Sequence, residues 1–116
     1  DNNVIKLMYD CRMNAQALQL LLGIRLREAR DMQLYIAFLK QEKGHRLMEQ
    51  RLGYSQALKE YLCIEETASS LVIREQKKSG AKVWDVRPLT QSMLDFAVRG
   101  VAHLQELYDE MLHRCK

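Results

Sequence analysis

Residues 88–115 read PLTQSMLDFAVRGVAHLQELYDEMLHRC, and this stretch carries the most regular pattern of the chain. Apolar side chains recur there in alternating steps of three and four residues, at Leu94, Ala97, Val101, Leu104, Tyr108, Met111 and Cys115. A stripe with this spacing follows one face of a helix that lies along another helix. Pro88 can open such a helix, because its missing N–H costs little in the first turn. The pattern therefore predicts one long helix over 88–115.

The first forty residues repeat this spacing. The apolar positions are Val4, Met8, Cys11, Ala15, Leu18 and Leu22, and after Arg25 they continue to Leu39. Gly23 lies within the pattern and costs about 1 kcal/mol relative to alanine, but no second helix breaker follows it. We therefore expect a helix of about fifty residues that ends at Gly53, roughly 75 Å long. Breaks at Gly23 or Gly44 are the alternative.

A third helix is predicted from Ser55 to Lys78, where two lysines precede Ser79 and Gly80 and so mark a helix end. The loop 81–87 holds Trp84, which we expect to be buried against the helices. The alternative is that Trp84 is an exposed anchor for a partner. The predicted fold is all-α: an antiparallel bundle of three long helices, or four if the first breaks, with coiled-coil-like packing. We expect one helical domain over 1–116 that belongs to a longer protein.

Composition narrows the function classes. The chain has 116 residues, of which 47% are hydrophobic and 28% charged, as in ordinary globular proteins. The net charge of +3 is small, and argues against a nucleic-acid partner. Since there is no long apolar run and no signal peptide, we expect no membrane contact. Three separated cysteines without a CxxC pair suggest a reducing compartment, and we predict a cytoplasmic protein.

Cationic residues gather in two places. The first group, near Arg25, is interleaved with acidic residues and is typical of a solvated helix face. The second group brackets the loop 81–87 and consists of Arg74, Lys77, Lys78, Lys82 and Arg87. These side chains could contact phosphate or an acidic partner. Only Trp84 lies near them as a stacking aromatic, so the nucleic-acid interpretation ranks below the others.

Two Glu-x-x-His elements, 42–45 and 110–113, raise the question of a metal site. On a helix each pair would present a carboxylate and an imidazole on one face, as in ferritin-like di-iron bundles. Gly44 interrupts the first pair, and only Glu65 falls within an apolar stripe as a further ligand. We therefore predict no metal and no cofactor, and keep a ferritin-like carboxylate–histidine bundle as the alternative function.

The chain shows neither the spacing of a nucleophilic triad nor a phosphate-binding glycine loop, so we predict no enzyme, no catalytic residue and no small-molecule substrate. A fifty-residue helix would leave part of its apolar stripe uncovered by two shorter helices. This predicts a non-enzymatic scaffold or adaptor module that self-associates as a homodimer. The expected partner-binding residues are Met8, Ala15, Leu18, Leu22 and Arg25.

Overall fold

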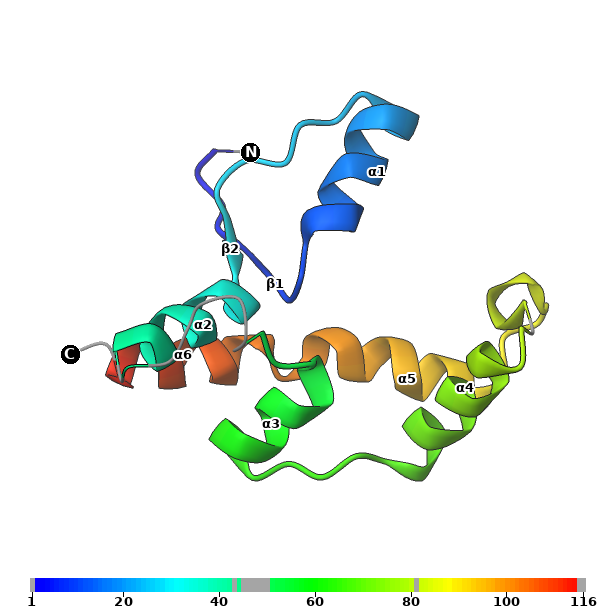
Figure 1. Cartoon of the computed structure of the whole chain (residues 1–116). Helices are drawn as coiled ribbons and strands as arrows, with labels where there is room; N and C mark the ends of the chain where they lie inside the picture. The colour runs from blue at the N-terminus through cyan, green and yellow to red at the C-terminus, as the bar shows by residue number, and fades with distance from the viewer. Residues whose placement is uncertain (1, 43, 45–50, 81, 115–116) are drawn as a thin grey trace.

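The computed structural model describes residues 2–42, 44, 51–80 and 82–114. Figure 1 shows its elements as short segments joined by turns. In chain order they are β1 (Lys6–Met8), α1 (Arg12–Leu22), β2 (Ala29–Asp31), α2 (Met32–Glu42), α3 (Tyr54–Leu62), α4 (Ala68–Lys78), the 3-10 turn η2 (Val83–Asp85), α5 (Gln91–Ala102) and α6 (Leu104–Arg114). The longest of these helices has 12 residues. The predicted bundle of three long helices is therefore wrong.

The first predicted helix ends at Gly23. This glycine has a φ of 65°, in the left-handed region that is accessible at little cost without a Cβ. Its N–H donates to the carbonyl of Gln19 at 3.1 Å, and the N–H of Ile24 donates to that of Leu18 at 3.1 Å. These bonds satisfy carbonyls at the end of α1 and turn the chain away from the helix axis. The apolar spacing continues past this point without continuing the helix.

The predicted helix 55–78 is divided in the same way. Cys63 adopts a φ of 57° and ends α3, although it is not a glycine. Thr67 then begins α4 by accepting a hydrogen bond from the N–H of Ser70 at 3.1 Å. A left-handed residue followed by a threonine cap separates two helices within a stretch whose apolar pattern looked continuous.

The predicted helix 88–115 also starts later than expected and is interrupted. Thr90 accepts the N–H of Met93 at 3.2 Å, so α5 begins at Gln91 and not at Pro88. His103, with φ −108° and ψ 6°, separates α5 from α6. Figure 1 shows α6 continuing from α5 across the middle of the molecule, between α1 above and α3 below.

The two strands form a small parallel sheet, which makes the all-α prediction wrong. Lys6 pairs with Ala29, and Met8 with Asp31. Parallel strands need a crossover connection, and α1 supplies it. Each strand has only three residues. A segment this short shows no period-two alternation in the sequence, which is why sequence analysis missed the sheet.

The carboxylate of Asp31 organises the end of this sheet. Its Oδ1 accepts the backbone N–H of Asp10 at 2.9 Å and that of Gln33 at 3.0 Å. Its Oδ2 accepts the N–H of Cys11 at 3.1 Å. One side chain therefore holds the turn between β1 and α1 and also caps the start of α2.

The main core lies between α2, α3 and α6. Its buried members are Met32, Ile36, Leu39, Leu52, Ala57, Leu104, Leu107 and Met111. A second, smaller cluster joins α4 to α5 through Ile73 and Met93, with the half-buried Phe96 packed against it. Figure 1 shows α1 apart from these layers, and none of its residues is buried. No helix in the described part of the chain has the length and apolar character of a membrane span.

We predict that Asp31→Ala lowers the free energy of unfolding by about 3 kcal/mol, because three backbone N–H groups lose a charged acceptor. Urea unfolding followed by circular dichroism measures this. Asp109→Ala removes an exposed carboxylate whose hydrogen bond among the described residues comes from Gln105, one turn earlier in α6, and should cost less than about 0.5 kcal/mol. Equal effects of the two substitutions would contradict the role assigned to Asp31.

Candidate functional site

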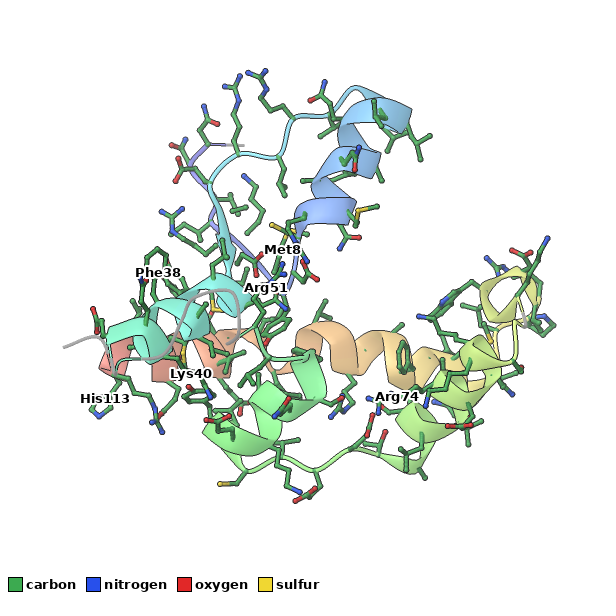
Figure 2. The ribbon with its side chains drawn as sticks, in the orientation of Figure 1. Met8, Phe38, Lys40, Arg51, Arg74 and His113 are labelled. Carbon is green, nitrogen blue, oxygen red and sulfur yellow. The ribbon has the colours of Figure 1, made fainter. Side chains whose placement is uncertain are left out.

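A concave pocket of about 840 Å³ lies between α3, α4 and α5. It is lined by Gly53, Tyr54, Ser55, Gln56, Lys59, Glu65, Glu66, Arg74, Lys77, Lys78, Phe96, Arg99 and Gly100. Figure 2 labels Arg74 on α4, the helix that packs against α5. Three short helices and the turn between the first two of them therefore supply its walls.

The pocket concentrates the positive charge of the chain. Five lining residues are Lys or Arg and two are Glu, an excess of three. The whole chain has 18 Lys and Arg residues against 15 Asp and Glu, which is also an excess of three. Formal charge outside the pocket lining is therefore balanced. A small net charge gathered on one concave surface creates a local positive potential that the chain average conceals.

Helix α4 supplies three of the cations from one side. Arg74, Lys77 and Lys78 are spaced three and four residues apart, so their side chains share a helix face. The ammonium of Lys77 lies 5.7 Å from the ring centre of Phe96 on α5. Trp84 packs near the same ring, with 6.1 Å between ring centres, but it remains 39% exposed. The predicted burial of Trp84 is therefore wrong.

Arg99 is the most buried cation of the pocket, with 9% of its surface exposed. Its Nη1 donates to Ser55 Oγ at 3.1 Å, and its guanidinium lies 5.8 Å from the ring centre of Tyr54. The Tyr54 hydroxyl donates in return to the backbone carbonyl of Arg99 at 2.7 Å. Burial raises the pKa of the Tyr54 phenol.

The two pocket carboxylates have different surroundings. Glu65 is 3.5 Å from the ammonium of Lys59, and both side chains are largely exposed. Glu66 is the less exposed of the two and pairs with Arg74, whose Nη1 lies 3.2 Å from its Oε2. Glu66 also accepts a hydrogen bond from Ser55 Oγ at 3.3 Å. Glu66 therefore belongs to the same network as Arg99, whereas Glu65 lies at the rim.

Part of this site is evident in the sequence. The sequence shows Arg74, Lys77 and Lys78 as a cationic cluster with Trp84 as its one nearby aromatic, whereas the fold also brings Phe96 beside these cations. Lys59 and Arg99 were missed, because each lies far along the chain inside a different helix. Their charge does not show where they lie in the fold. The packing of α3, α4 and α5 brings Lys59 and Arg99 to the same pocket as the cations of α4.

The predicted partner-binding residues lie elsewhere. Met8, Leu18 and Leu22 line a shallow apolar pocket between the end of β1 and α1. Ala15 is half-buried on α1, and Arg25 is exposed beyond the end of that helix. The binding role of this surface stays a prediction.

The ligands expected for the alternative, a ferritin-like metal site, are not gathered in the described part of the chain. Helix α2 ends at Glu42, and His45 lies outside the described residues. Glu110 is instead bound by Arg114 at 2.6 Å, and His113 is an exposed residue near the end of α6 (Figure 2). Within the described ranges, no three His, Cys, Asp or Glu side chains gather as metal ligands.

We predict that Tyr54→Phe lowers the free energy of unfolding by about 1–2 kcal/mol. The carbonyl of Arg99 is among the last four of α5, which lack partners within the helix, so it depends on this hydroxyl. Urea unfolding measures the change. Tyr35→Phe is the control: Tyr35 is half-buried against Tyr108, and its hydroxyl makes no hydrogen bond in the described part of the chain. A larger loss for Tyr35→Phe would contradict the assignment.

The sequence matches no protein-family model and no curated protein. The fold, by contrast, matches solved structures of RNase D from Trypanosoma brucei. The structure of its GMP complex is 25% identical with a TM-score of 0.79, covering 96% of this chain and 33% of that one. The structure of RNase D without GMP or RNA in its description is 24% identical with a TM-score of 0.76, covering 96% of this chain and 38% of that one. The complex with RNA U12 is 24% identical with a TM-score of 0.70, covering 96% and 36%.

This likeness overturns the remaining functional predictions. A scaffold or adaptor without enzymatic activity, acting as a homodimer, has no support from neighbours that are RNase D structures. The expected absence of nucleic-acid and small-molecule ligands conflicts with neighbours titled as complexes with RNA and with GMP. The chain spans only about a third of the RNase D chains that it matches. Over nearly its whole length, it is similar in fold to a part of T. brucei RNase D.

Proposed function

We propose that this chain binds RNA through the ribose–phosphate backbone, as part of a longer RNase D-like protein. The observation that supports this most is the pocket between α3, α4 and α5, which is lined by five cationic side chains and two carboxylates. The likeness to RNase D, including its complex with RNA U12, supports RNA as the ligand class. Binding through the backbone depends little on the nucleotide sequence of the RNA, because every nucleotide has a phosphate.

The lining has the two ingredients that single-stranded RNA requires. Lysine and arginine neutralise phosphates and release bound counterions, which supplies much of the affinity. Exposed aromatic rings offer surfaces on which bases stack. The half-buried ring of Phe96 lines the pocket, and the exposed Trp84 stands next to it. The combination favours an unpaired strand, whose bases are free to reach such rings.

Cleavage of RNA by the protein that carries this chain is supported by the likeness to RNase D alone. RNA binding has independent support from the residues themselves, and is therefore the function assigned to the chain. A cytoplasmic location remains a prediction from the cysteine pattern.

We predict that Lys77→Gln with Lys78→Gln weakens binding of fluorescein-labelled U12 by about 25-fold at 0.1 M salt. Two lost phosphate contacts should also reduce the slope of log affinity against log salt by about 1.4. Fluorescence anisotropy over a salt series measures both quantities. Circular dichroism checks that the helices remain.

The matched control is Arg25→Gln with Arg27→Gln, which removes the same charge from exposed residues outside the pocket. This control should change affinity by less than about threefold, through long-range electrostatics only. Equal losses for both double variants would mean that RNA does not bind in the pocket. No binding of U12 by the unmodified chain would overturn the proposed function itself.

A further inference from the structure

Two of the three guanidinium nitrogens of Arg99 donate no hydrogen bond within the described part of the chain. Its Nε and Nη2 are shielded from solvent and have no hydrogen-bond partner among the described residues. Leaving charged donors unpaired away from water is costly, so such groups need an explanation. Nε and Nη2 form one edge of the guanidinium, and the N–H bonds along that edge are parallel. This edge matches two oxygens of an oxyanion, as in bidentate arginine–phosphate pairs.

Ser55 connects this edge to a second arginine. Its Oγ accepts from Arg99 Nη1 at 3.1 Å and from Arg74 Nη2 at 3.3 Å, and donates to Glu66 Oε1 at 3.3 Å. A hydroxyl has one donor and two acceptor sites, so Ser55 is fully used. The result is two guanidinium groups held on one hydroxyl, with one carboxylate bound to the outer guanidinium.

We propose that Arg99, Arg74 and Ser55 form a binding site for one phosphate group, in which Glu66 occupies the phosphate's position on Arg74 while the site is empty. The proposal deepens the proposed function and rests on it for the RNA source of the phosphate. A carboxylate and a phosphate present similar paired oxygens to an arginine. Glu66 can therefore hold Arg74 in place before the ligand arrives.

Charge explains why a phosphate is the expected ligand. Of the two arginines, Glu66 binds Arg74. Nε and Nη2 of Arg99 have no acceptor among the described residues, and two oxygens are needed to bind them. A phosphate has more oxygens than a carboxylate and can engage both guanidinium groups together. Because Nε and Nη2 are covered in the empty site, a neighbouring side chain must shift on binding. Arg74, which is 46% exposed and shares Ser55 with Arg99, can move outward without leaving the pocket.

Glu66 is thus an internal competitor, and its removal should strengthen binding. We expect Glu66→Gln to tighten binding of GMP about fivefold, since a partly exposed carboxylate no longer competes for Arg74. The neighbouring Glu65→Gln makes the same charge change at a pair 3.5 Å apart and largely exposed. It should change the affinity less than twofold. Isothermal titration calorimetry measures both, with guanosine as the ligand that lacks a phosphate.

A second variant tests the arginine edge. Arg99→Lys keeps the charge but loses the paired N–H groups, and should weaken GMP binding about tenfold or more. Thermal unfolding by circular dichroism identifies a variant that fails to fold, in which case the comparison of Glu66→Gln with Glu65→Gln decides.

U12 without terminal phosphates distinguishes a terminal phosphate, as in GMP, from a phosphate of the RNA backbone. Tightening by Glu66→Gln for GMP alone supports a terminal phosphate, and tightening for both supports a backbone phosphate.

Equal affinities of Glu66→Gln and Glu65→Gln for GMP and for U12 would overturn the phosphate site. If the unmodified chain still binds U12 in that case, the proposed RNA binding survives. If U12 does not bind but Glu66→Gln selectively tightens GMP, the phosphate site holds and RNA binding fails. Tightening of guanosine to the same extent as GMP would also overturn the proposal, because no phosphate would then be required.

Discussion

The contact between Arg99 and the first residues of α3 joins the hydrophobic core of this protein to the cationic pocket on its surface. Tyr54 donates to the backbone carbonyl of Arg99, and the Arg99 side chain donates to Ser55. Tyr54 packs against the main core and against the ring of Tyr9, with 5.2 Å between ring centres. Packing that stabilises α3 therefore also positions Arg99, the most buried cation of the pocket.

The charge of the pocket follows from this arrangement. Arg99 would be a poorly solvated cation without compensation, and the aromatic face of Tyr54 and the hydroxyl of Ser55 supply only part of it. Glu66 reaches Arg74 and not the open edge of Arg99. The excess of positive charge is thus held beside a shaped, partly apolar surface, which is the electrostatic environment that a phosphate chain requires.

Helical spacing in the sequence located some core positions, among them Leu104 and Met111 on α6, but Leu94 and Val101 of the same stripe are exposed. It could not locate the ends of helices, because single residues decide them. Gly23 and Cys63 adopt left-handed backbone conformations, and Thr67 supplies a cap, while the apolar period runs on across these breaks. Short helices then fold back on each other, which removed the argument for a long exposed stripe and a coiled-coil dimer.

The candidate site was less predictable than the fold, for a related reason. Its cations come from three helices, and the sequence shows only the α4 group as a cluster. The most direct measurement of the central claim is a two-dimensional amide NMR spectrum of the labelled chain titrated with U12. We expect the largest shifts to fall in 53–56, 74–78 and 96–100. Shifts concentrated in 12–25, or no saturable shifts, would contradict it.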